Sequence, residues 1–375
     1  MYAVLLTDRT RLFMSQQPRI KDIAEQAGVS PGTVDRVLHD RGNVASDVRE
    51  RVLRVMKEMG YEPNLMARSL ANNRKVLRIA AILPDYTTDP YWAQPKEGIE
   101  RAAEAVRHYG VAVDFYFFPM FDPAAFLNTV KNVLKTQLGA ILFAPLFRHE
   151  SEYLIAESSR QGIPKVMINT NIEGTDALCY IGQDSYQSGV LAGRLLNFGL
   201  NDGDHAMVLN LDKEVSNARH LLDKERGFKD FFDREKDKSI EIHSEIFEDF
   251  DDPKQLKDWV YGQLEKYPRL TGFFVTNSRA YKLAGVLNPA EQKRVKIVGF
   301  DLVEANLALL SDNKIRFLIN QNAWHQGYLG ILAIVNSLIL KKEMPQNQYL
   351  PLDVVVKENV EYYLRRTLEL PMTVL

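Results

Sequence analysis

The stretch that decides the architecture is residues 19–71, RIKDIAEQAGVSPGTVDRVLHDRGNVASDVRERVLRVMKEMGYEPNLMARSLA. Four apolar residues recur at helical spacing and end at Gly28-Val29; they are Ile20, Ile23, Ala24 and Ala27. Ser30 is suited to N-cap a second helix, with Pro31 at its first position, where the missing N–H does no harm. Two short helices joined by a glycine-containing turn predict a helix-turn-helix. The second helix of this motif enters the major groove of DNA.

A third helix and a marginal fourth one follow. Ser46 is placed to start the third helix, and Gly60 to stop it. Its predicted buried face consists of Val48, Val52, Val55, Met56 and Met59. Asn64 is a candidate N-cap for residues 65–72, a segment of about two turns. Isolated helices shorter than ~12–15 residues are marginal in water, so we expect this hinge segment to fold only when something packs against it.

Composition indicates a globular protein of two or three domains. The chain has 375 residues, of which 46% are hydrophobic and 26% charged. The single cysteine, Cys179, excludes an internal disulfide framework and fits a reducing cytoplasm. No apolar run approaches the roughly 18–20 residues of a membrane span. The start, MYAVLLTDRTRLF, is a poor signal peptide, so we expect a cytoplasmic protein. Residues 1–18 form an N-terminal extension, of which residues 1–13 are either an upstream start or a disordered arm.

The net charge of −2 conceals an asymmetry along the chain. Residues 19–78 carry 12 Lys and Arg against 8 Asp and Glu, whereas residues 79–375 carry 33 against 40. A basic head on an acidic body is expected if only the head approaches phosphates. Small helical domains are also often mildly basic by chance, so the motif and not the charge carries the prediction of DNA binding.

From Leu77 onward, strand-like runs alternate with helical segments. The predicted strands are 78–83, 111–118, 140–143, 165–168, 206–211, 272–275 and 295–300. The predicted helices include 95–108, 126–135, 188–198 and 254–266. This alternation predicts an α/β fold with parallel sheets covered by helices on both faces. About 300 residues exceed one such unit, so we expect two lobes.

Ligands of open α/β sheets bind in the crevice outside the carboxyl ends of the strands. The stretch after the first strand offers both flat aromatic faces and hydroxyl-binding groups, as a sugar requires: Tyr86, Asp89, Tyr91 and Trp92. Polar residues also follow later strands: Asn169, Asn171, Asn277, Asp301 and Gln321. Two alternatives stay open. Tyr91 and Trp92 are either ligand-stacking or core aromatics, and Asp184 either touches ligand or caps the helix after it.

The head resembles the DNA-binding domain of the lactose-repressor (LacI/GalR) family of transcription regulators. The matching residues are Asp22-Ile23-Ala24, Ala27-Gly28-Val29-Ser30, Thr33-Val34, Arg36-Val37, Val44, Arg49, Val52, Gly60-Tyr61, Pro63-Asn64 and Ala67-Arg68-Ser69-Leu70. Residues beyond the head resemble the periplasmic-binding-protein-like effector domain of the same family, through Tyr180-Ile181-Gly182, Asp184, Gly189, Val298-Gly299-Phe300-Asp301, Gln321 and Gly327. The predicted organisation is a DNA-binding domain at 19–63, a hinge and linker at 64–77, and a two-lobed ligand-binding and dimerisation domain at 78–375.

The resemblance implies which residues meet DNA. They are Ser30, Pro31, Gly32, Thr33, Asp35, Arg36, His39, Asn43, Asn64, Arg68 and Leu70. Asp35 stands where the family usually has Ser, and it either accepts a hydrogen bond from cytosine or pairs with a neighbouring Arg. Arg36 is either a base reader or a phosphate clamp. Leu70 maps to the family's hinge leucine, which wedges into the minor groove; the alternative is a solvent-exposed or core leucine.

The resemblance also implies a ligand contact at Arg219 or at His220, and the sequence leaves the choice open. Ser278 follows Asn277 where the family often has Asp, and this departure affects the ligand contact implied for Asn277. The implied partners are a small polar effector such as a sugar, double-stranded operator DNA of palindromic sequence, and a second copy of the chain, because a two-fold protein matches a palindrome.

Motifs of known enzymes and cofactor sites are missing from the sequence. There is no G-x-S-x-G, H-E-x-x-H, P-loop or G-x-G-x-x-G after a strand. The seven histidines are scattered, so we expect neither a metal nor a cofactor nor enzymatic activity. The leading hypothesis is a ligand-controlled transcription factor. A secreted sugar-binding protein and a sugar-acting enzyme are the alternatives.

Overall fold

The computed structural model describes residues 19–38, 42, 44–59, 76–213 and 217–369. The chain divides into two compact units, Met1–Arg74 and Lys75–Leu375. Several predicted features lie outside the described residues: the extension 1–18, the stop at Gly60, the hinge helix, and the side chains of His39, Asn43, Asn64, Arg68 and Leu70.

In the part of the first unit that the structure describes, three helices surround one small apolar core. They are α1 (Ile20–Ala27), α2 (Pro31–Leu38) and α3 (Ser46–Glu58). The core consists of Ile23, Ala24, Ala27, Val34, Val37, Val52, Val55 and Met56. Gly28 ends α1 with a φ of +64°, which glycine adopts without strain. The third helix begins at Ser46 as predicted, and the residue before it, Ala45, provides no side-chain cap.

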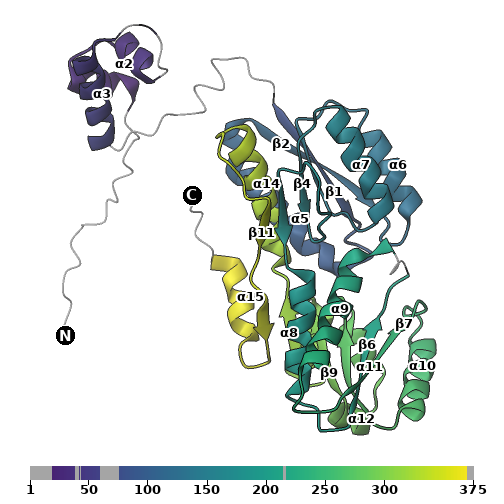
Figure 1. Ribbon diagram of the computed structural model, residues 1–375. Helices are drawn as coiled ribbons and strands as arrows, with labels where there is room; N and C mark the ends of the chain where they lie inside the picture. Colours follow the sequence, from purple (N-terminus) through teal and green to yellow (C-terminus); the bar gives the residue numbers. More distant parts are fainter. Residues whose placement is uncertain (1–18, 39–41, 43, 60–75, 214–216, 370–375) are drawn as a thin grey trace, which may run out of the picture. The chain divides into compact units, whose positions relative to one another are not determined.

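The second unit consists of two lobes, each built on a six-stranded sheet (Figure 1). The strands of the first lobe are β1 (Leu77–Pro84), β2 (Val111–Phe118), β3 (Ala140–Phe143), β4 (Lys165–Ile168), β5 (Cys179–Gly182) and β11 (Asn347–Tyr349). They lie in the order β11-β5-β4-β3-β1-β2 and all pair in parallel.

The second lobe repeats this design with one difference. Its strands are β6 (His205–Asn210), β7 (Glu241–Ile246), β8 (Leu270–Val275), β9 (Lys296–Phe300), β10 (Phe317–Asn320) and β12 (Asp353–Val355). Their order is β12-β10-β9-β8-β6-β7. The edge strand β12 runs antiparallel to β10, so the sheets are mostly and not wholly parallel.

Helices cover both faces of each sheet. In the first lobe they are α5 (Ala93–Val106), α6 (Pro123–Val133), α7 (Arg148–Arg160) and α14 (Ala323–Leu338), with short 3₁₀ turns η1 (Pro90–Trp92) and η2 (Arg107–Tyr109). In the second they are α8 (Ser185–Asn197), α9 (Arg219–Arg234), α10 (Pro253–Lys266), α11 (Ala280–Val286), α12 (Pro289–Arg294), α13 (Glu304–Ser311) and α15 (Val360–Glu369). Separate apolar clusters fill the two faces of each sheet, which gives three layers per lobe.

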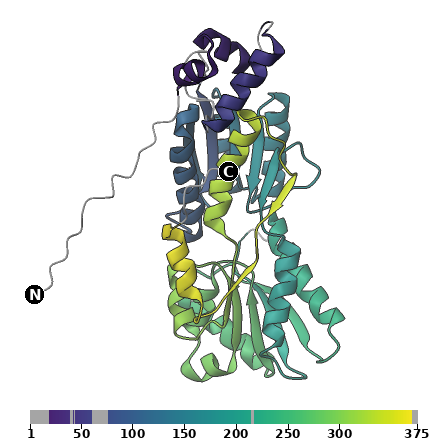
Figure 2. The same ribbon diagram turned by 90° about the vertical axis from the view of Figure 1, so that its left-hand side faces the viewer.

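The chain crosses between the lobes three times, and Figure 2 shows the crossings at the middle of the unit. The crossings join β5 to α8, β10 to α14, and β11 to β12. Each lobe is therefore assembled from segments far apart in the sequence. The carboxyl ends of β1, β4, β6, β8 and β9 meet between the lobes, because their following residues line one cavity.

Close packing between α8 and α9 fixes the position of these two helices beside the cleft. A Cβ atom at Gly189 in α8 would overlap the backbone carbonyl of Lys224 in α9. Only glycine permits this approach, which holds Lys224 against the sheet. None of the helices in the described ranges combines the length and apolarity of a membrane span.

Candidate functional site

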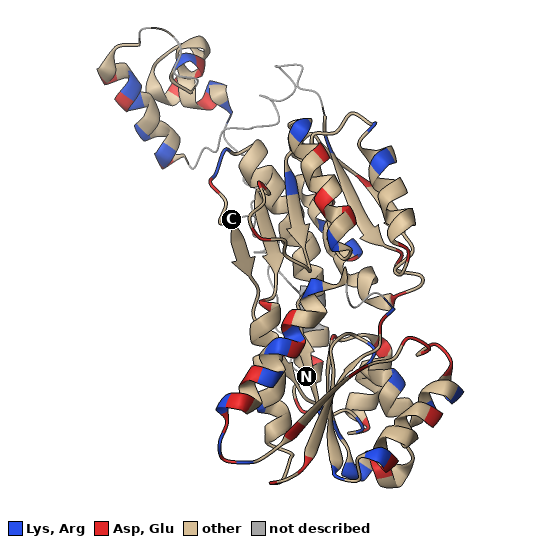
Figure 3. Ribbon diagram, turned by 45° about the vertical axis from the view of Figure 1, so that its right-hand side comes forward, with Lys and Arg blue, Asp and Glu red and all other residues tan. Residues whose placement is uncertain are grey.

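The start of α2 presents the predicted DNA-contacting residues at the surface of the first unit. Ser30 caps the helix, because its Oγ accepts a hydrogen bond from the backbone N–H of Thr33 at 3.1 Å. Pro31, Gly32 and Arg36 are exposed, and Asp35 is partly buried. Lys and Arg are interspersed with Asp and Glu on the helices of this unit (Figure 3). The Lys and Arg side chains of this surface can therefore contact phosphates, and the N-terminal end of α2 can contact base edges.

A small polar cavity of about 40 Å³ lies between the lobes of the second unit. Eight of the twelve predicted ligand residues line it: Asp89, Tyr91, Trp92, Asn169, His220, Asn277, Asp301 and Gln321. Most of them follow strand ends in the two sheets, as the rule for α/β crevices requires. Six further residues complete the lining: Met120, Leu146, Asp212, Lys224, Ser278 and Arg279.

An ion pair joins the lobes at this cavity. Arg279 of the second lobe contacts Asp89 of the first at 2.6 Å, and Asp212 of its own lobe at 3.4 Å. All three side chains are less than 10% exposed. The guanidinium also lies 5.1 Å from the ring centroids of Phe121 and Phe250. A buried cation with two carboxylates holds the lobes closed over the cavity.

Asp301 is the most distinctive group in the cavity. It follows β9 with a φ of +68°, a region that residues other than glycine seldom adopt. Its Oδ2 accepts a hydrogen bond from Gln321 at 2.6 Å, whereas Oδ1 is buried without a hydrogen-bond partner. Burial raises the pKa of this carboxyl. Backbone strain and an unsatisfied buried oxygen both occur at binding sites, where a ligand supplies the missing partner.

Lys224 supplies a buried cation beside Asp301. Its Nζ donates to the Thr276 carbonyl at 2.9 Å and lies 3.7 Å from the ring centroid of Phe300. Burial lowers the pKa of Lys224, and the charge of Asp301 opposes that shift. The pair can accept and donate hydrogen bonds to the hydroxyls of one ligand.

His220 forms a second contact between the lobes. Its Nδ1 lies 3.2 Å from Oγ1 of Thr170 in the first lobe. Burial, followed by the charge of Lys224, lowers the pKa of His220 to about 3. The imidazole is therefore neutral at pH 7, and the structure places His220 rather than Arg219 in the central cavity.

The shifted pKa of His220 predicts a pH dependence of stability. The unfolded chain takes up a proton near pH 6.5, but the folded chain does so only near pH 3, so stability falls as the pH drops below 6.5. Between pH 7.5 and pH 5 this one group should remove about 2 kcal/mol from the free energy of unfolding. Urea unfolding of wild type and His220→Gln at both pH values measures the difference, since groups common to both proteins cancel. Equal pH dependences would mean that His220 is not buried in solution.

The two aromatic residues after β1, Tyr91 and Trp92, are both core residues and part of the cavity wall. Tyr91 and Trp92 are 5% and 2% exposed, pack edge to face at 5.0 Å, and also line the cavity. The Tyr91 hydroxyl accepts a hydrogen bond from Asn169 at 2.7 Å. Asn169 follows β4 with a φ of +69°, so it is the counterpart in the first lobe of Asp301 in the second.

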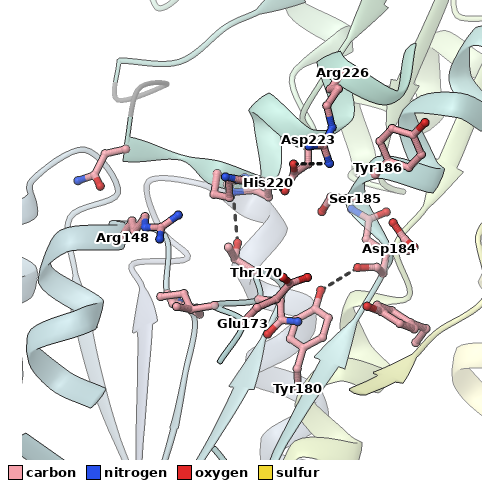
Figure 4. A pocket seen from close by; sticks show the side chains of 17 residues that line it. Arg148, Thr170, Glu173, Tyr180, Asp184, Ser185, Tyr186, His220, Asp223 and Arg226 are labelled. Carbon is pink, nitrogen blue, oxygen red and sulfur yellow. Dashed lines mark hydrogen bonds and ion pairs between the residues drawn. The ribbon is translucent and has the colours of Figure 1, made fainter. Parts of the chain in front are cut away.

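A larger polar cavity of about 650 Å³ adjoins the central one, and His220 lines both (Figure 4). Three predicted residues lie here and not at the centre: Asn171, Asp184 and Arg219. Asp184 caps α8 by accepting from the Gln187 N–H at 2.9 Å, and Arg219 pairs with Asp223 at 3.0 Å. Figure 4 shows His220 and Thr170 pointing toward one another at this cavity.

A third cavity, of about 750 Å³, shares Asp89 and Arg279 with the central one and carries aromatic side chains. Phe121, Phe250 and Tyr281 line it together with Lys282. The central cavity is thus flanked by a polar and a more apolar space.

Two predicted residues have other contacts. Tyr86 packs on Phe117 at 5.3 Å between ring centroids and does not line any of these three cavities. Asn277 lines the central cavity, but its amide already donates to the Leu211 carbonyl at 3.0 Å and accepts from the Arg279 N–H at 3.2 Å. Asn277 therefore shapes the loop that carries Arg279.

Sequence reasoning missed Asp212, Lys224 and Arg279, although signals for the first two were present. Asp212 follows a strand in the same way as Asp301. Lys224 is four residues after His220, which places both on one face of a helix. Arg279 has no comparable signal, because its partner Asp89 is 190 residues away.

Comparisons with known proteins agree with both units. Residues 19–64 match the family model described as bacterial regulatory proteins, lacI family, and residues 79–342 match the periplasmic binding protein domain. The chain is 37% identical over 175 residues to the HTH-type transcriptional regulator MalR of Streptococcus pneumoniae, a match covering 45% of this chain and 50% of that protein. It is 31% identical over 159 residues to catabolite control protein A of Staphylococcus aureus, covering 42% and 45%. These matches span about half the length of the curated relatives or less.

Among solved structures, GanP of Geobacillus stearothermophilus, a glucose-galactose binding protein, has the same fold as the second unit. The TM-score is 0.67 at 22% identity, over 76% of this chain and 99% of that chain.

Proposed function

Since residues 79–342 belong to the periplasmic binding protein domain family and residues 19–64 match the lacI family of bacterial regulatory proteins, we propose that the chain is a transcriptional regulator. Its affinity for operator DNA depends on a small polar ligand bound between the lobes. The observation that carries the proposal is the central cavity, where both lobes contribute buried polar groups and Asp301 has an oxygen without a partner. The same chain carries a helix-turn-helix, so ligand binding and DNA binding reside in one molecule.

The ligand that fits this chemistry is a sugar or polyol. Asp89 and Asp301 accept hydrogen bonds from hydroxyls, Lys224 donates them, and the rings of Tyr91 and Trp92 provide apolar faces. Burial raises the pKa of the Tyr91 hydroxyl, which therefore keeps its proton for donation. The fold shared with a glucose-galactose binding protein is compatible with this class of ligand.

Ligand entry requires the lobes to separate. The cavity of about 40 Å³ holds water but not a monosaccharide, since ligand pockets are typically ~300–1,000 Å³. The contacts Asp89–Arg279 and Thr170–His220 therefore have to open and form again around the ligand. Each arrangement of the lobes is a candidate for one state of the switch.

The remaining parts of the proposal concern assembly and location. We propose that two copies associate through the second unit and bind a palindromic operator in the cytoplasm. The head alone covers a half-site. The relatives MalR and catabolite control protein A are named as regulators, which favours regulation over catalysis.

A thermal-shift screen of the full-length protein against sugars and polyols tests the ligand. At 100 times its dissociation constant, a ligand that binds only the folded state adds about 2.7 kcal/mol of stability. A sugar that raises the melting temperature of wild type and has no effect on Asp301→Asn supports the assigned cavity. Equal shifts in both proteins would place the ligand elsewhere.

Arg36 provides the test of the DNA-binding surface. We expect Arg36→Ala to weaken binding to an operator selected from random duplexes by about tenfold or more, because an exposed guanidinium on α2 contacts either a base or a phosphate. Loss concentrated at one base pair indicates base reading, and uniform loss with a shallower salt dependence indicates a phosphate contact. Arg101→Ala, an exposed arginine on α5 of the second unit, is the matched control. If both variants bind as tightly as wild type, α2 is not the recognition helix.

A further inference from the structure

A cluster of two histidines and a glutamate lies on the second lobe, outside the cleft. His205 begins β6 and pairs with Glu241, the first residue of the edge strand β7. His243 is two residues further along β7, so it projects from the same face of the sheet as Glu241. Parallel pairing thus brings together three potential metal ligands from positions 205, 241 and 243. The cleft lies at the opposite ends of these strands, since Asp212 follows the carboxyl end of β6.

The three side chains lie close enough together to share one metal ion. Nε2 of His243 lies 3.1 Å from Nδ1 of His205 and 3.6 Å from Oε1 of Glu241. Nε2 of His205 lies 3.5 Å from Oε2 of Glu241. A tetrahedral zinc ion with bonds of about 2.0–2.1 Å separates its ligand atoms by roughly 3.3 Å. These distances involve both nitrogens of His205 and both oxygens of Glu241, whereas one ion takes a single atom from each residue. One ligand atom from each of the three residues lies within 4.8 Å of the other two, so side-chain rotation can bring three such atoms around one ion.

The two imidazoles are partly buried and held by neighbouring side chains, as metal-binding histidines usually are. The two imidazoles are 20% and 12% exposed, and the ring of Tyr267 stacks on His243 at 3.9 Å between centroids. The Glu241 side chain is 63% exposed, which leaves room for a water molecule as the fourth ligand.

We propose that His205, His243 and Glu241 form a binding site for a divalent transition-metal ion, with Zn²⁺ as the best match. Two imidazole nitrogens and one carboxylate oxygen suit zinc, and a fourth position open to solvent is compatible with its tetrahedral geometry. The ion links the edge strand β7 to β6 and stabilises the second lobe. This site is separate from the ligand cleft and does not depend on the proposed regulatory function.

The competing explanation is a hydrogen bond between two neutral histidines beside a solvated carboxylate. The two explanations differ in their response to zinc. A metal site takes up one ion per chain and loses it when any ligand is replaced, whereas a hydrogen-bonded pair does not bind zinc with defined stoichiometry.

Isothermal titration of the metal-free, full-length protein with Zn²⁺ tests the site. We expect one ion per chain, at least tenfold weaker binding in His243→Gln and Glu241→Gln, and unchanged binding in His108→Gln, an exposed histidine elsewhere. Zinc should also raise the melting temperature of wild type and of His108→Gln only. Glu241→Gln keeps the readout usable if a histidine variant folds poorly, because its side chain is exposed. Absence of saturable binding, or equal binding by wild type and both ligand variants, overturns the proposal.

Discussion

Asp301→Asn should weaken binding of the effector by about 10- to 150-fold, because a hydrogen bond to a charged group contributes about 1.5–3 kcal/mol. The substitution keeps the shape of the side chain and its contact with Gln321, but it removes the charge from the oxygen that has no partner in the cavity. Basal operator binding should stay unchanged, since the residue belongs to the second unit. Calorimetric titration with a sugar identified in the screen measures the effect.

Asp312→Asn is the matched control for this prediction. Asp312 is exposed and pairs with Lys314 at 3.2 Å, away from the cavity. The Asp312→Asn variant should bind the ligand with the same affinity as wild type. A loss of operator binding in Asp301→Asn with its ligand affinity intact would contradict the assigned cavity.

Arg279→Ala should lower the free energy of unfolding of the ligand-free second unit by about 3–5 kcal/mol, the usual cost of leaving a buried charge without its partner. Two buried carboxylates, Asp89 and Asp212, lose their cation in this variant. Urea unfolding of the full-length protein, monitored by tryptophan fluorescence, measures the loss. All three tryptophans lie in the second unit.

The control for Arg279 is Arg148→Ala, which removes an exposed i,i+4 ion pair with Glu152. Such pairs contribute about 0.3–0.5 kcal/mol. Arg279→Lys should be intermediate, because it keeps the charge but not the two-pronged contact. If Arg279→Ala is no less stable than Arg148→Ala, the lobes are not held together by this pair in solution.

Regular elements with strong apolar patterns were predictable from sequence. The strands at 111–118, 140–143 and 165–168 have the predicted bounds. The latter two are fully buried runs, and the first is a mostly apolar and aromatic run that is buried at its two ends. The edge strand β7, EIHSEI, was missed because its residues are mostly half-exposed and carry no apolar run. The short strands β11 and β12 were missed for lack of length.

The starts of α5, α6, α8 and α10 in the second unit were predicted too late, and for the last three the physical reason is the same. The apolar periodicity begins inside each helix, whereas the backbone turns at an aspartate cap before it. Asp122, Asp184 and Asp252 accept hydrogen bonds from the first turns of α6, α8 and α10. These caps were readable from the sequence, and using them would have placed the starts correctly.

Most of the predicted ligand residues line the central cavity, whereas the contacts between them were not predicted. The rule that ligands bind beyond strand ends identified Asp89, Asn169 and Asp301. This rule does not say which side chains contact one another across the lobes, so the contact of Arg279 with Asp89 could not be predicted from the sequence. The same limit applies to His205 and His243, which looked scattered in sequence and are neighbours on paired strands.

The most direct test of the account is the affinity of the full-length protein for its selected operator, measured by fluorescence anisotropy with and without the sugar found in the screen. Coupling between two sites on one molecule is typically about 1–3 kcal/mol, so the dissociation constant should change by about 5- to 150-fold. By reciprocity, operator DNA should change the affinity for the sugar by the same factor, and Asp301→Asn should show no change at the same sugar concentration. An operator affinity that stays constant while the sugar saturates the wild-type cavity would contradict ligand-controlled DNA binding.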